Sequence, residues 1–320
     1  MRAVRYHDYG GPDVLQVDDV AEPTPDPDEV VLSVAAAAVN PVDTYFRSGA
    51  YQAAGLPMTT GCDAAGEVVA VGDDVDAYET GDRAVATGLS RTHQGACAEQ
   101  VAVPTDRLAG LPADADVREA GAVGVAGVTA YRALVDDADL DPAEDVLIHG
   151  GSGGVGHLAV QVGAATGANV VTTAAPTYHE EVEALGADTV LDYDRDDLVD
   201  AVRDATDGGP DVVLDHRLDD YLSFDAEVAA QDARIIGIGE NETAAGFENV
   251  GLTRSKDLTL RFTSMFNTPS LARVLDRVAR LLASGDMAVE IAHSYDLDGV
   301  AEAHRAVMEE SFLGKLVVEP

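Results

Sequence analysis

Residues 149–156 read His149-Gly150-Gly151-Ser152-Gly153-Gly154-Val155-Gly156, and this glycine-rich stretch is the most informative part of the chain. It follows a strand-like run at Asp145–His149 and opens a helical pattern at Val155–Thr166. Its G-x-G-x-x-G spacing gives a tight turn, lets backbone approach a diphosphate and lets the helix pack on the sheet. The stretch therefore predicts a dinucleotide-binding loop, with a glycine turn that serves only close packing as the alternative. We expect contacts from Gly151, Ser152, Gly153, Gly154, Val155 and Gly156.

The middle of the chain alternates strand-like and helix-like patterns around this loop. Further strand-like runs lie at Asn169–Thr173, Thr189–Tyr193, Asp211–Asp215, Arg234–Ile238 and Leu258–Phe262. Helical patterns lie near Tyr178–Leu185, Leu198–Thr206 and Ser223–Ala230. Such alternation predicts βαβ units with right-handed crossovers. Six strands would complete a doubly wound, parallel α/β sheet of the Rossmann type.

The two ends of the chain have a different pattern. Short apolar runs punctuated by Gly and Pro occur at Val30–Val34, Glu67–Val71, Arg83–Thr87 and Ala96–Val103. These runs predict a compact barrel-like or sandwich-like unit. In the tail we expect an amphipathic helix at Leu271–Leu281, a shorter helix around Val300–Val307 and a final strand at Lys315–Val318.

The chain is strongly acidic, with 58 Asp and Glu against 20 Lys and Arg and a formal net charge of −38. This charge argues against nucleic acid or an anionic membrane as a partner. It favours the cytoplasmic protein of a halophile, in which salt screens the self-repulsion; an acidic docking face is the alternative. Two cysteines are too few for a disulfide scaffold or a four-cysteine zinc site. No apolar run of transmembrane length or signal-peptide pattern is evident, so we expect a soluble cytoplasmic protein.

The end of the second strand of the predicted sheet bears on the choice of nucleotide. Sites that prefer NAD place Asp or Glu there to hold the ribose 2′-hydroxyl. This chain has Thr173, Ala174 and Ala175 instead, and Thr177 and Tyr178 follow as hydrogen-bond donors for a 2′-phosphate. Tyr193, which ends the next strand, is a further candidate contact, with packing at the sheet edge as its alternative role. The pattern favours NADPH as the cofactor.

Several motifs resemble the quinone oxidoreductases and zeta-crystallin, a zinc-independent family of medium-chain dehydrogenases/reductases. They are Asn40-Pro41-Val42-Asp43, Gly61-Cys62-Asp63-Ala64-Ala65-Gly66-Glu67-Val68, Gly81-Asp82-Arg83-Ala84, Gly127-Val128-Thr129-Ala130-Tyr131 and Gly314-Lys315. The resemblance spans essentially the whole chain. It implies a Rossmann domain at 122–264, inserted in a GroES-like β-barrel catalytic domain formed by 1–121 and 265–320. It also implies a homodimer or homotetramer.

The resemblance further implies a metal-free reaction. Zinc-dependent relatives hold catalytic zinc with a Cys and a Gly-His-Glu motif; here the Cys position falls within Asn40–Asp43, and Cys62 replaces the His. Cys62, Asp63 and His93 could be imagined as ligands, but nothing in their spacing requires it, so we expect no metal. Without a Lewis acid, an electron-poor acceptor is the sensible substrate, either a quinone or an α,β-unsaturated carbonyl.

Candidate site residues follow from the same resemblance. We expect Tyr45 and Asn40 to line the substrate site, and Thr129 to support the nicotinamide or pack on its helix. Cofactor contacts are also expected from Gly237, Gly239 and Asn267. His216-Arg217 departs from the Val-Gly-Gly of the family and puts the substrate in doubt. An enoyl-type reductase and a low-turnover NADPH-binding protein remain the alternatives.

Overall fold

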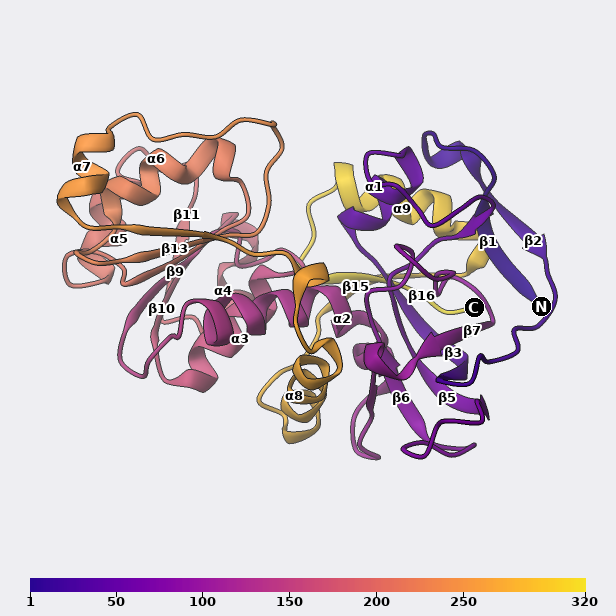
Figure 1. The fold of residues 1–320 in the computed structure, drawn as a ribbon. Coiled ribbons are helices and arrows are strands. Elements are labelled where there is room, and N and C mark those ends of the chain that lie inside the picture. The colour runs from indigo at the N-terminus through magenta and orange to yellow at the C-terminus, as the bar shows by residue number, and fades with distance from the viewer. The chain divides into compact units, whose positions relative to one another are not determined.

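In the computed structural model, which describes residues 1–320, the glycine-rich stretch joins strand β9 (Asp145–Ile148) to helix α3 (Gly156–Thr166). The chain divides into two compact units. Unit 1 comprises residues 1–128 and 269–320, and unit 2 comprises residues 129–268. Figure 1 shows both as ribbons. No helix is both long and apolar enough to cross a membrane.

Unit 2 contains a six-stranded sheet in the order β11-β10-β9-β12-β13-β14, and every neighbouring pair is parallel. Its other strands are β10 (Asn169–Ala174), β11 (Thr189–Asp192), β12 (Val212–Asp215), β13 (Arg234–Gly237) and β14 (Thr259–Phe262). Numbered from β9, this is the order 3-2-1-4-5-6 of the Rossmann fold. The predicted doubly wound α/β sheet is confirmed, with strand ends close to those expected.

Helices cover both faces of this sheet (Figure 1). α3 and α4 (His179–Ala184) lie on one face, and α5 (Leu198–Ala205), α6 (Leu218–Val228) and α7 (Val250–Ser255) lie on the other. The core beneath α5 and α6 contains Leu147, Val171, Leu191, Val202, Val213, Leu218, Leu222, Val228 and Ile235. Strands buried on both faces explain why the sequence shows continuous apolar runs instead of alternation.

Helix α6 begins at Leu218, earlier than the Ser223 expected from sequence. The first turn contains Asp219 and Asp220, whose carboxylates interact favourably with the positive end of the helix dipole. The loop after β12 is therefore confined to His216 and Arg217.

Unit 1 is mainly antiparallel. Its larger sheet has the order β15-β16-β3-β5-β6-β8, with β7 also paired to β3, and its smaller sheet has the order β2-β1-β4. The strands of the larger sheet are β3 (Glu29–Val39), β5 (Asp63–Val71), β6 (Arg83–Ala86), β7 (Gln100–Pro104), β8 (Leu108–Gly110), β15 (Ile291–Tyr295) and β16 (Lys315–Val318). Those of the smaller sheet are β1 (Arg2–Tyr6), β2 (Leu15–Asp19) and β4 (Met58–Thr59). Because β16 pairs with β3, the two ends of the chain share one GroES-like unit.

Helices complete unit 1. They are α1 (Pro41–Ser48), α8 (Leu271–Ser284), α9 (Val300–Glu309) and α2 (Val117–Tyr131), within which the unit boundary falls. Val274, Leu275 and Val278 of α8 are buried, as its amphipathic pattern predicts. α2 packs by close approach instead, since a Cβ added to Gly121 would lie 2.5 Å from the carbonyl oxygen of Ala36.

Candidate functional site

The glycine-rich loop is packed too closely for side chains at several positions. Gly150 has φ +69°, which favours glycine. A Cβ on Gly151 would lie 2.3 Å from Oγ1 of Thr172 on β10, and one on Gly156 would lie 2.0 Å from the carbonyl oxygen of Gly150. Gly153 differs, because its nearest neighbour would be the Gly150 oxygen at 3.2 Å. Gly151 and Gly156 are thus needed for the fold of the loop, whereas a Cβ on Gly153 would make one tight contact that a small shift could relieve.

The amides of the loop fall into two groups. Those of Gly150 and Gly151 donate to Oγ1 and the carbonyl oxygen of Thr173, at 3.1 and 2.8 Å. Those of Ser152, Gly154 and Val155, which are half-buried, donate to no atom of the chain. Unpaired amides just before a helix form a binding site for a phosphate group. Thr173 is 2 % exposed, and its side chain and carbonyl oxygen hold the first two amides of the loop.

The carboxyl end of β10 is buried up to Ala174, and the residues that follow are half-buried or exposed. Thr177 is exposed, Tyr178 is half-buried, and Nε2 of His179 lies 3.1 Å from the carbonyl oxygen of Ala174. Tyr193, directly after β11, is 46 % exposed, so its ring is accessible rather than packed in the sheet.

The structure also brings a carboxylate near this place that the sequence reasoning missed. Asp192 is the register partner of Ala174, at the end of the neighbouring strand β11. Its Oδ1 accepts a hydrogen bond from the amide of Asp194 at 3.0 Å. The signal is present in the sequence, because parallel neighbours end at the same edge of a sheet and Asp192 directly precedes Tyr193.

The glycines at the end of β13 and just after it contact parts of unit 2 itself. A Cβ on Gly237 would lie 2.5 Å from the Leu218 side chain, and one on Gly239 would lie 2.8 Å from the carbonyl oxygen of His216. Close packing at the start of α6 therefore explains why glycine occupies both positions, whether or not a cofactor lies nearby. Asn267 is exposed in a 3-10 turn after β14.

In unit 1, Asn40 lies in a buried polar cluster with residues from distant parts of the chain. Its Nδ2 donates to Oδ2 of Asp63 at 2.9 Å, and its Oδ1 accepts from Nζ of Lys315. Asn40 is 2 % exposed and Lys315 is 4 % exposed. Both polar atoms of the Asn40 side chain are therefore used within the chain. Sequence reasoning cited Lys315 only for its family resemblance and did not identify it as a site residue.

Asp63 is the centre of this cluster. Its carboxylate accepts hydrogen bonds from Oγ1 of Thr87 at 2.6 Å and from the amide of Val125 at 3.0 Å, in addition to Asn40. Burial raises the pKa of Asp63, while Lys315 and these donors oppose the rise. Burial likewise lowers the pKa of Lys315, and the carboxylates of Asp63 and Asp43 counteract it. The cluster is thus a buried pair of opposite charges that Asn40 connects, because its side chain contacts both Asp63 and Lys315.

Asp43 and Cys62 border the cluster. Burial raises the pKa of Asp43 to about 6, opposed by a hydrogen bond from Cys62. The pKa of Cys62 is raised well above its ordinary value by burial and by the two nearby carboxyl groups. Cys62 is fully buried and stays a thiol, as expected for a small core residue rather than a metal-binding thiolate.

These donors do not fit a zinc ion. The chain contains no group of three or more His, Cys, Asp and Glu side chains arranged to hold a metal. His93 pairs instead with the hydroxyl of Thr92 at 2.8 Å. A buried ammonium beside Asp63 repels a second cation and already provides the charge compensation that a metal would bring.

Tyr45 lies on α1, half-buried, with its ring 5.5 Å from that of Tyr51 in an edge-to-face arrangement. Thr129 is on α2 and 7 % exposed. Arg47 is buried, and its guanidinium contacts the carbonyl oxygen of Gly10 at 3.1 Å and Nδ1 of His304 at 3.2 Å.

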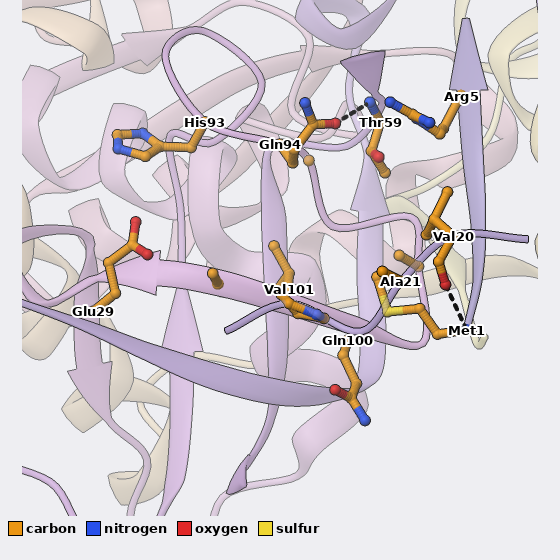
Figure 2. Close-up of a pocket in the computed structure, with 14 residues that line it drawn as sticks. Met1, Arg5, Val20, Ala21, Glu29, Thr59, His93, Gln94, Gln100 and Val101 are labelled. Atoms are coloured by element: carbon orange, nitrogen blue, oxygen red, sulfur yellow. Dashed lines mark hydrogen bonds between the residues drawn. The ribbon is translucent and has the colours of Figure 1, made fainter. Parts of the chain in front are cut away.

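A pocket of about 370 Å³ also lies within unit 1. Figure 2 shows its lining, where the amide of Thr59 donates to Gln94 at 2.8 Å and the terminal amine of Met1 donates to Val20 at 2.9 Å. None of the predicted site residues lines this pocket. We assign no role to it.

Comparisons with known proteins agree along the chain. Residues 26–145 match the family profile "Alcohol dehydrogenase GroES-like domain", and residues 185–318 match "Zinc-binding dehydrogenase". The quinone oxidoreductase of Lama guanicoe is 34% identical over 99% of this chain and 97% of that protein. A solved NAD-dependent alcohol dehydrogenase is similar, with TM-score 0.92, 29% identity and full coverage of both chains. So is the Escherichia coli quinone oxidoreductase complexed with NADPH, with TM-score 0.89, 28% identity and full coverage of both chains.

Proposed function

This chain belongs to the quinone oxidoreductase family of the medium-chain dehydrogenases/reductases, and from that membership we propose that it transfers a hydride from NADPH to a quinone without a metal ion. The observation that carries the proposal is the set of unpaired amides at Ser152, Gly154 and Val155, which precede α3. They fit the diphosphate of a dinucleotide. Residues 122–264 then form the dinucleotide-binding domain, and residues 1–121 with 265–320 form the catalytic domain.

NADPH is favoured over NADH by the end of β10. Ala174 and Ala175 present no carboxylate to repel a 2′-phosphate. Thr177 and Tyr178 supply hydroxyl donors nearby, and the accessible Tyr193 supplies a third. Asp192 is the opposing feature, but its carboxylate already accepts the Asp194 amide. The similar E. coli enzyme was solved with NADPH.

The residues of the chain bind and orient, and the bound nucleotide supplies the hydride. The loop amides fix the diphosphate, and Thr129 and Asn267 are proposed to support the nicotinamide end. Tyr45 is proposed to donate a hydrogen bond to the carbonyl oxygen of the acceptor as negative charge develops there. Asn40 acts indirectly, because its amide is held by Asp63 and Lys315 and keeps the start of α1 in place.

The Lys315 cluster supports the metal-free part of the proposal. Asp63, Asp43 and Cys62 stand where the resemblance would place the zinc-binding region. In this chain Asp63 bonds to Asn40 instead, and Asn40 in turn accepts from the ammonium of Lys315. A quinone accepts hydride with only hydrogen-bond assistance at oxygen, so the reaction does not need the Lewis acid that this cluster replaces.

Steady-state oxidation of NADPH and NADH, measured in molar KCl, tests the proposal. The acceptors are 1,4-benzoquinone, 9,10-phenanthrenequinone, a simple enone and an enoyl thioester. We expect saturable quinone turnover with NADPH preferred. Turnover of the thioester without turnover of either quinone would establish the enoyl-type reductase instead, and nucleotide binding without turnover of any acceptor would establish the binding protein.

The variant Tyr45→Phe tests the role of the hydroxyl. It keeps the ring that packs on Tyr51, and the loss of one hydrogen bond should lower kcat roughly five- to tenfold. The matched control is Tyr51→Phe, which removes a hydroxyl from the same aromatic pair and should leave kcat unchanged. Equal kcat in the wild type and Tyr45→Phe would remove Tyr45 from the mechanism.

A further inference from the structure

The side chain of His149, the residue directly before the glycine-rich loop, contacts two residues of helix α6. Its Nε2 lies 2.7 Å from Oδ1 of Asp225, and its ring stacks on Tyr221 with centroids 4.4 Å apart. The side chain of His149 is 1 % exposed and that of Asp225 is fully buried. Burial lowers the pKa of His149 to about 4, so the imidazole is neutral near pH 7 and donates its Nε2 proton to Asp225.

Asp225 faces a second buried carboxyl group, that of Asp215 at the end of β12. The two side chains are close enough to hydrogen bond to each other. Oδ2 of each is buried and receives no hydrogen bond from a donor of the chain. Carboxylates only accept hydrogen bonds, so one proton held between the two groups is what satisfies both oxygens.

The surroundings favour retention of that proton. Burial raises the pKa of Asp215 to about 7 and that of Asp225 to about 8. The amide of Arg217 donates to Oδ1 of Asp215 at 2.6 Å and opposes the rise. The guanidinium of Arg217 pairs with Asp220 rather than with either carboxyl group. Near neutral pH the pair therefore carries one negative charge, and at higher pH it carries two.

A second histidine, His216, also lies against the glycine-rich loop. The ring of His216, the residue after Asp215, would lie 2.9 Å from a Cβ on Gly150. It also interacts with the backbone carbonyl of His149. The first turn of the glycine-rich loop is thus fixed between His149, which Asp225 holds, and His216, which follows Asp215 in the chain.

We propose that Asp215 and Asp225 are positioning residues for the dinucleotide. Through one shared proton and His149 they hold the glycine-rich loop in its binding conformation. Because that proton can be lost, they also make nucleotide affinity depend on pH. The proposal rests on the proposed function, because the ligand of the loop is the diphosphate of NADPH. Loss of the shared proton to solvent leaves two repelling carboxylates beneath a loop that must bind another anion. Affinity therefore falls as pH rises through the titration of the pair.

The variant Asp215→Asn imitates the protonated pair. The new amide oxygen can accept from the Arg217 amide, and its NH2 group can donate to Asp225 in place of the shared proton. The dissociation constant of NADPH, followed by its fluorescence in molar KCl from about pH 6 to about pH 9, is the readout. Asp204→Asn is the matched control, because it removes one exposed carboxylate of α5 outside the network.

For the wild type and Asp204→Asn we expect the Kd to rise on the order of tenfold over this range. For Asp215→Asn it should stay near the value that the wild type has at low pH. Comparing variants at each pH cancels the titration of the nucleotide's own phosphate. A wild-type Kd that is independent of pH, or an Asp215→Asn variant with the wild-type slope, overturns the proposal.

Proton uptake by the wild type gives a second measurement that needs no variant. Calorimetric titration with NADPH at about pH 8, in two buffers of different ionisation enthalpy, should show uptake of up to about one proton. No uptake overturns the proposal even if Asp215→Asn fails to fold. Absence of NADPH binding by the wild type at every pH would instead refute the proposed function.

Discussion

Removing the ammonium of Lys315 should destabilise the protein strongly. Lys315→Met keeps most of the side-chain volume, so little cavity forms. It removes the donor to Oδ1 of Asn40 and the cation nearest Asp63, leaving that carboxylate buried without a counter-charge. Removing one partner of a buried ion pair costs about 3–5 kcal/mol, and Lys315 and Asp63 are coupled through Asn40 rather than by direct contact. Asp63 keeps its bonds from Thr87, Val125 and Asn40, so we expect the lower end, about 3 kcal/mol.

Urea unfolding at fixed molar KCl, followed by circular dichroism, measures this loss. A second variant combines Lys315→Met with Asp63→Asn, which removes both charges, and should recover about 2 kcal/mol relative to Lys315→Met. The control is Arg280→Met, which breaks the exposed pair of Arg280 with Asp276 and should cost less than about 1 kcal/mol. A loss below about 1 kcal/mol in Lys315→Met, or no recovery in the double variant, would refute the attraction between Lys315 and Asp63 as the main interaction of the cluster.

Three other outcomes are expected. Gly153→Ala should still fold, because its Cβ would meet only the Gly150 oxygen at 3.2 Å and a small shift of the loop relieves that contact, yet it should weaken NADPH binding at least tenfold by filling the approach to the loop amides. Gly246→Ala, in open space, should fold and bind NADPH like the wild type in a fluorescence titration. The pKa of Asp43 is raised from 3.8 to about 6, so the wild type loses stability as pH rises through this interval and the buried carboxyl group ionises. Asp43→Asn does not ionise, so in urea unfolding its stability relative to the wild type should increase by up to about 3 kcal/mol between about pH 4 and pH 8. With a net charge of −38, the thermal midpoint should rise with KCl concentration, and a midpoint independent of salt would contradict significant self-repulsion.

The dinucleotide fold could be predicted because its sequence signals are local. The G-x-G-x-x-G spacing reflects close contacts between residues near in sequence, such as the approach of Gly156 to Gly150. The flanking strand and helix have regular apolar patterns, so β9 and α3 were expected within a residue of their ends. The bounds of helix α2 were not predicted, because it is largely apolar and has no strong periodicity in its sequence.

The polar clusters could not be predicted, because their members are far apart in the sequence. Lys315 bonds to Asn40 from 275 positions away, and Asp225 bonds to His149 from 76 positions away. No local pattern records such pairs. Asn40 was therefore expected to face the substrate, although the fold uses its whole amide to connect β16, α1 and Asp63.

The most direct measurement is a single turnover of the protein after exhaustive treatment with a chelator. The protein is loaded with NADPH in molar KCl, mixed rapidly with 1,4-benzoquinone, and followed by the loss of NADPH absorbance. We predict full-amplitude oxidation at a rate that added zinc does not increase. Oxidation that occurs only after zinc is restored, or no quinone-dependent oxidation from a saturated NADPH complex, would contradict metal-free hydride transfer by this chain.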